Sequence, residues 1–251
     1  MTIRETPERT VWPPVEEVVC GFFFESLPID ALDLGVYWKS RQADFPQKKL
    51  SGALIGDVAE LTLDIPLTRA WLVSARGDFI VQIQSDRFYM NWRRREGEYP
   101  RFSDRADTVG LKTRALQEFA RFTEFCESHV ALQPRLLRLE LTKIDVFRRG
   151  THYQNAEELG RMLKVAKVFE DIQASSATQL HLRLDENRKD GSVHVAIAAD
   201  AGAARVETRT IFAPGDDLDS CFQAANRRVN DVFFGLLSQE SMARLAGEVL
   251  P

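Results

Sequence analysis

Residues 71–93 read WLVSARGDFIVQIQSDRFYMNWR, and apolar and polar side chains alternate along them between two short turns. Two-residue turns at Arg76-Gly77 and Ser85-Asp86 predict a three-stranded antiparallel meander. Counting outward from the turns gives the pairs of one face, which are Leu72 with Val81, Ile83 with Phe88, Val81 with Met90, and Phe79 with Trp92. Because this face is almost wholly apolar, we expect it to be buried.

The other face of the meander is predicted to be mixed in character. Trp71 shares it with Gln82 and Tyr89, and Asp78 lies opposite Arg93. Its remaining members are Val73, Ile80, Gln84, Arg87 and Asn91. The sheet is thus expected to have one apolar face and one polar-aromatic face.

A second meander is predicted further along the chain. Its apolar pairs join Leu180, Leu182 and Leu184 to Val193, Val195 and Ile197, across a loop that ends in Asp190 and Gly191. A turn at Ala201 and Gly202 sets Ile197 opposite Val206. The outer face carries His181, Arg183, His194, Glu207 and Arg209, which we expect to face water.

Each meander is followed by an amphipathic helix and preceded by a strand and a helix. The following helices are predicted over residues 108–130, behind Asp107 as N-cap, and over residues 218–237. Their core-facing residues are Val109, Leu116, Phe119, Phe122 and Cys126 in the first helix, and Leu218, Phe222, Ala225, Val229, Val232 and Leu236 in the second. The preceding elements are a strand at 15–24 with a helix at 30–45, and a strand at 136–147 with a helix at 156–169 that Asn155 caps.

The two halves therefore share the order strand, helix, three strands, helix, with an offset of roughly 110 residues, the size of a typical domain. We interpret them as two tandem β-α-β-β-β-α units, 13–133 and 134–251, behind a tail at 1–12, and expect one compact domain. The fold class is α+β, in a two-layer arrangement that is TATA-binding-protein-like or helix-grip-like. Edge-to-edge pairing of the units would leave a broad open sheet face, and packing as separate layers is the alternative.

Composition and charge argue against several classes of protein. The chain has 251 residues, of which 44% are hydrophobic and 28% charged, as in globular proteins. Residues 1–10 are polar and no run of about 18 apolar residues occurs, so we expect a cytoplasmic protein without a membrane span. Cys20, Cys126 and Cys221 are far apart and odd in number, which fits reduced, buried thiols. The net charge of −4 disfavours nucleic-acid binding.

A run of cationic and aromatic residues is the strongest candidate for a binding site. It extends from the last strand of the first meander into the following loop. Guanidinium groups bind carboxylates and phosphates through two parallel hydrogen bonds, and amides add further donors and acceptors. The candidate binding residues are Gln82, Gln84, Arg87, Tyr89, Asn91, Arg93, Arg94, Arg95, Tyr99 and Arg101. The structural alternative is a solvated charge run in which Arg93 pairs with Asp78.

Three blocks of the sequence resemble a sporadically distributed bacterial family of uncharacterised proteins. The blocks are residues 13–20, residues 79–93 with Tyr99-Pro100-Arg101, and residues 139–142, and the resemblance covers most of the chain. The middle block carries a Gln-x-Gln, Phe-x-x-Asn-Trp-Arg and Tyr-Pro-Arg pattern. Lys143 and Asp145, expected on the outward face of their strand, replace an aromatic and an amide residue of the family pattern. The resemblance implies no activity, and the family's patchy distribution fits accessory genes of mobile elements, defence or toxin-antitoxin loci.

No catalytic motif is apparent. The sequence lacks a P-loop, a dinucleotide-binding Gly pattern, an H-E-x-x-H helix, paired C-x-x-C motifs and a G-x-S-x-G elbow, so we expect no catalytic residue, metal or cofactor. His181 and His194 approach each other across the second meander with Glu207 nearby, but such histidines are more often solvated than ligating. His129 is expected at a helix end, and His152 as a bare loop residue.

The sequence favours a non-catalytic binding or adaptor protein that holds a protein or an anionic partner on the mixed face and the Arg-rich loop. The expected partner is another protein or a second copy of the chain. The alternative is a nucleic-acid-associated component of a mobile-element, defence or toxin-antitoxin locus, which the consecutive arginines at 93–95 favour. A weaker alternative is an enzyme or small-ligand binder with a pocket between sheet and helices.

Overall fold

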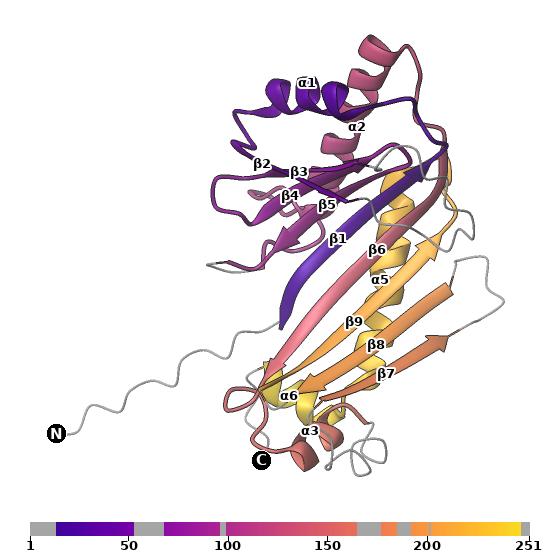
Figure 1. The fold of residues 1–251 in the computed structure, drawn as a ribbon. Coiled ribbons are helices and arrows are strands. Elements are labelled where there is room, and N and C mark those ends of the chain that lie inside the picture. Colours follow the sequence, from indigo (N-terminus) through magenta and orange to yellow (C-terminus); the bar gives the residue numbers. More distant parts are fainter. Residues whose placement is uncertain are drawn as a thin grey trace.

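A computed structural model describes residues 14–52, 68–95, 99–164, 177–184, 192–200 and 202–246. Within them, one antiparallel sheet has the strand order β2-β3-β4-β5-β1-β6-β9-β8-β7 (Figure 1). The strands are β1 (Val15–Phe24), β2 (Gln47–Gly52), β3 (Thr68–Val73), β4 (Phe79–Gln84), β5 (Arg87–Arg93), β6 (Leu136–Arg148), β7 (Ala177–Leu184), β8 (Ser192–Asp200) and β9 (Ala203–Phe212). The protein is therefore of the α+β class, with β1 and β6 paired at the middle of the sheet.

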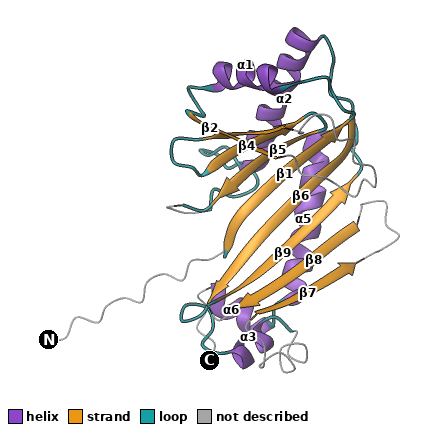
Figure 2. Ribbon diagram, viewed as in Figure 1, coloured by secondary structure: helices purple, strands orange, loops and turns teal. Residues whose placement is uncertain are grey.

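The described helices pack on one side of this sheet (Figure 2). They are α1 (Ala31–Arg41), α2 (Leu111–Val130), α3 (Ala156–Met162), α5 (Leu218–Leu236) and α6 (Gln239–Ala246). Phe119 of α2 and Phe222 of α5 both contact the ring of Phe22 on β1, so these two helices cover the middle strands. α1 lies against α2 through Tyr37. Among the described helices, none combines the length and the apolar character that crossing a membrane would require.

The register predicted for the first meander is confirmed. Leu72 lies opposite Val81, Val81 opposite Met90, Ile83 opposite Phe88, and Phe79 opposite Trp92. Trp71 lies opposite Gln82, which in turn lies opposite Tyr89, so these three residues share the other face. A one-residue slip would have exchanged the two faces, so the turn lengths settle which side chains enter the core.

The second meander also has the predicted pairs. Leu180, Leu182 and Leu184 lie opposite Ile197, Val195 and Val193, and Ile197 lies opposite Val206. Asp190, Gly191 and Ala201 of the predicted turns lie outside the described residues, as do the side chains of His181 and Arg183.

The core between sheet and helices falls into two apolar clusters. The larger one gathers aromatic rings, among them Phe22 and Phe119, beneath α2 and the first half of α5. The smaller one surrounds Phe147 near α3 and α6. α5 spans both clusters, because Phe222 belongs to the first and Phe233 to the second.

The first long helix begins later than predicted. Gly110 is the N-cap of α2, so the prediction of Asp107 was wrong, and Val109 lies exposed outside the helix. The Gly110 amide donates to Asp104 Oδ1 at 2.6 Å. A Cβ at Gly110 would lie 2.5 Å from the carbonyl carbon of Ser103, so the close backbone approach requires glycine. The N-cap prediction used only the preference for capping side chains, which does not include backbone contacts of this kind.

Other boundaries differ in smaller ways. Neither β2, an edge strand, nor α6 was predicted. The β2 sequence QKKLSG lacks the apolar alternation that indicates a strand. α1 ends at Arg41, whereas the prediction extended to residue 45. The helix predicted at 156–169 ends at Met162, and residues 165–169 lie outside the described residues. Its N-cap is confirmed, since Asn155 Oδ1 accepts from the Glu158 amide at 2.9 Å.

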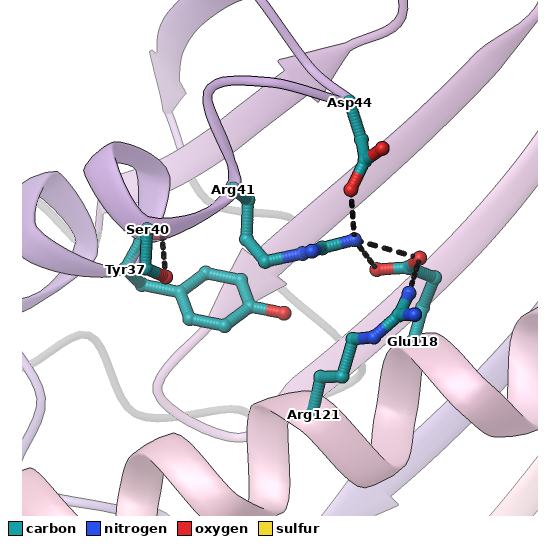
Figure 3. Close-up of polar contacts among 6 residues, drawn as sticks. All are labelled: Tyr37, Ser40, Arg41, Asp44, Glu118 and Arg121. Carbon is teal, nitrogen blue, oxygen red and sulfur yellow. Dashed lines mark hydrogen bonds and ion pairs between the residues drawn. The ribbon is translucent and has the colours of Figure 1, made fainter.

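A cluster of charges around the buried Glu118 holds α1 and the turn after it against α2 (Figure 3). Arg41 donates from Nη2 to both carboxylate oxygens of Glu118, each at 2.9 Å. The same nitrogen lies 2.9 Å from Asp44 Oδ2, and Arg121 Nη1 lies 2.6 Å from Glu118 Oε1. Because Glu118 is buried, its charge depends on these guanidinium groups rather than on water.

Candidate functional site

The six strand residues of the predicted binding patch share the sheet side that no described helix covers, which we call the polar face. They are Gln82 and Gln84 on β4, and Arg87, Tyr89, Asn91 and Arg93 on β5. Arg93 keeps 33% of its side chain exposed, whereas the other five residues are buried. The structure thus brings the six together, but the centre of the patch is packed rather than open to solvent.

Side-chain hydrogen bonds connect the amides of the polar face to β1 and β3. Gln82 Nε2 donates to Asn91 Oδ1 at 3.0 Å, and Asn91 Nδ2 donates to Glu17 Oε1 at 2.7 Å. The Glu17 oxygen also lies 3.0 Å from Arg93 Nε. On the other side, Arg69 Nη1 donates to Gln82 Oε1 at 3.3 Å. These amides are therefore used largely by internal partners, which satisfies their hydrogen bonding.

Trp71 forms the centre of one cation–π cluster on the polar face. The guanidinium groups of Arg69 and Arg93 lie 5.0 and 5.6 Å from the centroid of its ring. Asp78, the predicted partner of Arg93, instead accepts a hydrogen bond from Ser74 Oγ at 2.7 Å. Arg93 is therefore placed by Glu17 and by the indole ring.

Phe23 forms the centre of a second cation–π cluster. Arg138 and Arg87 lie 4.3 and 5.2 Å from its ring centroid. Arg87 is fixed by two hydrogen bonds to Asp86, from Nε at 2.9 Å and from Nη2 at 2.6 Å. Arg138 is exposed, and within the described part of the chain it forms neither a hydrogen bond nor an ion pair. The guanidinium of Arg87 is thus held by Asp86, whereas no described residue accepts a hydrogen bond from Arg138.

Gly21 lets the ring of Tyr89 lie across β1. It stands between Tyr89 on β5 and Glu140 on β6. A Cβ at Gly21 would lie 2.8 Å from Tyr89 Cε1 and 3.0 Å from Glu140 Cβ. Burial raises the pKa of Tyr89 to about 12, so the phenol stays neutral at physiological pH.

A buried carboxylate lies at the middle of the polar face. Glu140 accepts a hydrogen bond from Thr142 Oγ1 at 2.9 Å, and its burial raises its pKa. Arg138 and Arg209 oppose that rise through their charges, although neither forms an ion pair with Glu140. Arg209, on β9, likewise has no hydrogen-bond or ion-pair partner among the residues described. Two guanidinium groups therefore lie near the Glu140 carboxylate without forming an ion pair with it.

Three of the four loop residues of the predicted patch lie apart from the polar face, and the fourth, Arg94, lies at its edge, 3.8 Å from Glu16 Oε1. Arg94 donates to a β1 carbonyl at 2.9 Å, and its guanidinium lies 5.8 Å from the ring of Trp92. Tyr99 packs edge-on against Trp92, on the helix-facing side of the sheet. Arg95 and Arg101 are exposed, and Arg95 Nε donates to a carbonyl of the β3–β4 turn at 3.3 Å. The loop is thus a separate surface.

Lys143 and Asp145 face the helices, so the prediction that they point outward was wrong. Both are buried in the helix-facing row of β6, and Lys143 Nζ donates to Asn230 Oδ1 on α5 at 2.7 Å. Thr208, opposite Lys143, is fully buried, and its hydroxyl has no hydrogen-bond partner within the described ranges. Burial raises the pKa of Asp145 to about 7 and lowers the pKa of Lys143 to about 8. The charges of Lys143 and Arg94 oppose the rise at Asp145, and the charge of Asp145 opposes the fall at Lys143.

Replacing Asp145 with Asn should change how stability varies with pH. Between its ordinary pKa of 3.8 and its folded-state value of about 7, Asp145 binds more protons in the folded than in the unfolded chain. The stability that it contributes therefore falls as pH rises through this window. Relative to wild type, Asp145→Asn should gain more than about 1.4 kcal/mol in free energy of unfolding between about pH 5 and about pH 8, in urea denaturation.

The control for this comparison is Asp107→Asn, which removes an exposed carboxylate. Its difference from wild type should stay nearly constant over the same interval. A constant difference for Asp145→Asn, or one that moves in the opposite direction, would show that the buried carboxylate does not titrate in this window.

The histidines do not form a site in the part of the chain that is described. No group of three or more His, Cys, Asp or Glu that could hold a metal occurs there. His152 is buried rather than a bare loop residue, and its Nδ1 accepts from the Arg148 amide at 2.8 Å. His194 Nε2 lies 3.1 Å from Ser192 Oγ, and His129 lies in the last turn of α2 as predicted.

Sequence reasoning missed several residues that build the polar face. They are Glu17, Phe23, Arg69, Arg138 and Glu140. Alternation within each strand already places them opposite the apolar positions. What was missing is the strand order, since only the pairing of β1 with both β5 and β6 brings Glu17, Phe23, Arg138 and Glu140 beside the meander.

No protein-family model matches the chain, and no curated protein matches it.

Proposed function

We propose that the protein is a non-catalytic binding protein that holds an anionic partner on the polar face. One observation carries the proposal: cations outnumber carboxylates on this face, although the whole chain has a net charge of −4. The described cations are Lys49, Arg69, Arg87, Arg93, Arg138, Arg148, Arg205 and Arg209, and the described carboxylates are Glu16, Glu17, Asp78, Asp86, Glu140, Asp200 and Glu207. A local cationic surface on an acidic protein attracts anionic partners and disfavours cationic ones.

The accessible cations surround a packed centre. Arg138 and Arg205 are exposed, and Arg69, Arg93 and Arg209 are half-buried. The buried amides and rings between them hold the strands and thereby fix where the guanidinium groups stand. Fixed donors lose less conformational entropy on binding than donors on mobile loops, so this arrangement supports a binding role.

We further propose that the sheet consists of two related units, 13–133 and 134–251, packed edge to edge as in a TATA-binding-protein-like or helix-grip-like fold. Support comes from the order of the described elements, since β1, α1, β3, β4, β5 and α2 are followed by β6, α3, β7, β8, β9 and α5. β2 is an addition in the first unit. In this interpretation the polar face is shared by both units.

A nucleic-acid-associated role, in an accessory locus of the kind that the family resemblance implies, remains the second proposal. The same cations would attract phosphates. Tyr99, however, the aromatic residue nearest these arginines in the following loop, packs its ring against Trp92. A cytoplasmic location belongs to the proposal as well, supported by the free, buried thiols of Cys20 and Cys126.

The weaker alternative of a small-ligand pocket has less support. The cavity lined by Val18, Cys20, Phe79, Met90, Trp92 and Leu111 is apolar and has a volume of about 10 Å³. A single water molecule needs at least that much space.

Binding to polyanions tests the proposed function. Polyglutamate, polyphosphate and single-stranded DNA, each fluorescently labelled, are titrated at about 50 mM and about 200 mM salt. We expect salt-sensitive binding of at least one of them, and its loss when Arg93, Arg138 and Arg209 are all replaced by Gln. The matched control replaces the exposed helix-side or loop residues Arg105, Arg114 and Arg227 by Gln, which removes the same charge elsewhere. If no polyanion binds at the lower salt, or if both triple variants bind equally weakly, the proposal is wrong.

A further inference from the structure

We infer that the anionic partner is an acidic segment of another protein, whose carboxylate side chains bind Arg138 and Arg209. This inference rests on the proposed function of the polar face. The two arginines come from neighbouring strands, β6 and β9, and their charges act on Glu140 from both strands. Neither has a hydrogen-bond or ion-pair partner among the described residues, and Arg138 is exposed while Arg209 is half-buried.

The position of Arg138 is well suited to a carboxylate. Its guanidinium lies 4.3 Å from the ring centroid of Phe23, which is itself buried. Arg87 contacts the same ring and is fixed by Asp86, so the ring is held in place. A guanidinium stacked on a fixed ring keeps the donors on its edge free, and two parallel donors match the two oxygens of a carboxylate.

The aromatic residues of the polar face disfavour a single-stranded nucleic acid. Sequence-independent binding of such strands depends on open ring faces on which bases stack. Here Phe23 is contacted by Arg87 and Arg138, and Trp71 has two guanidinium groups near its ring. A nucleic acid would therefore gain contacts to charge alone.

The carboxylates of the polar face also select among anions. Glu17, Glu140 and Glu207 lie between the arginines, on β1, β6 and β9. A phosphodiester strand, with its uniform charge, would bring negative groups against them, at a cost in binding free energy. An extended peptide whose acidic residues are separated by uncharged ones can place its carboxylates at the arginines only. The pattern of charges thus favours a protein segment.

The experiment compares three labelled probes by fluorescence anisotropy at low salt. They are a short peptide of alternating Glu and Ser, the same peptide with Gln in place of Glu, and an oligothymidine of equal charge. We expect the Glu peptide to bind most tightly and the Gln peptide not to bind. Arg138→Gln should weaken binding of the Glu peptide roughly tenfold, the effect of about one charged hydrogen bond. Arg209→Gln should weaken it as well, which gives a second variant should the first fold poorly.

Arg114→Gln is the matched control. Arg114 is exposed and also lies over an aromatic ring, 4.0 Å from the centroid of Phe79, but it belongs to α2 on the helix side. This variant should bind the Glu peptide like wild type. If it weakens binding as much as Arg138→Gln does, overall charge explains the result and the inference is wrong. If oligothymidine binds more tightly and Arg138→Gln weakens that binding, the inference fails while the proposed function stands. If none of the anionic probes binds, both fail.

Discussion

Replacing Trp92 with Ala should lower the free energy of unfolding by about 3 to 5 kcal/mol, the range for truncating a large buried aromatic side chain. Trp92 is 5% exposed and lies opposite Phe79 in the apolar row between sheet and helices. Tyr99 packs edge-on against its ring at 5.4 Å, so the loop after β5 loses a contact as well. Urea denaturation followed by far-UV circular dichroism measures the change without relying on the fluorescence of the deleted indole.

Trp71→Ala is the control for this measurement. It removes the same side chain from a neighbouring strand, but Trp71 is half-buried on the polar face. We expect a smaller loss, because part of the indole already contacts water in the folded state. Equal losses for the two variants would show that the helix-facing row is not the better packed of the two.

Replacing Arg41 with Met should lower the free energy of unfolding by about 3 kcal/mol, the lower end of the range for removing one member of a buried ion pair, because Arg121 still contacts Glu118 at 2.6 Å. The side chains of Arg41 and Glu118 are 13% and 7% exposed. Methionine keeps most of the apolar stem of arginine, so the loss reports on the charge rather than on a cavity. Thermal and urea unfolding at neutral pH give the measurement.

Arg121→Met provides the control for this prediction. Arg121 also contacts Glu118, at 2.6 Å, but it is 47% exposed (Figure 3). Its removal should cost no more than about 1 kcal/mol. Combining Arg41→Met with Glu118→Met should recover much of the lost stability, since an apolar pair can replace a buried ion pair. A double variant as unstable as Arg41→Met alone would mean that packing, not the unpaired carboxylate, explains the loss.

The register of the first meander could be predicted because two short turns fixed the count. With the turns at Arg76-Gly77 and Ser85-Asp86 in place, alternation alone put Trp92 beside Phe79 and Trp71 on the other face. β2 escaped prediction because an edge strand with one face to solvent needs no apolar alternation. The start of α2 was not predicted correctly because it depends on a backbone contact at Gly110, and local residue preferences do not predict that contact.

For the candidate site, the sequence predicted which side chains share a sheet face, but not which residues they form hydrogen bonds with. Strand alternation placed Gln82 and Asn91 on one face, and the structure agrees. The hydrogen bond from Asn91 Nδ2 to Glu17 forms because β1 pairs with β5. A single sequence does not reveal that strand order. Lys143 was assigned to the outward face by comparison with the family pattern, whereas its spacing from Leu141 places it inward. There the periodicity was the better guide.

The pairing of β1 with β6 has a consequence for the order of folding. The two strands are far apart in the sequence. The ion pairs near their ends, Arg135–Glu25 and Arg148–Glu16, join residues that are 110 and 132 positions apart. During synthesis, β1 can pair with β5 soon after both emerge, but its other edge stays open until β6 has been made. That open edge presents unpaired amides and carbonyls beside apolar side chains such as Val18 and Phe22, which is a surface prone to pairing with other chains. A nascent chain that stalls before residue 136 is therefore expected to depend on chaperones more than the finished protein does.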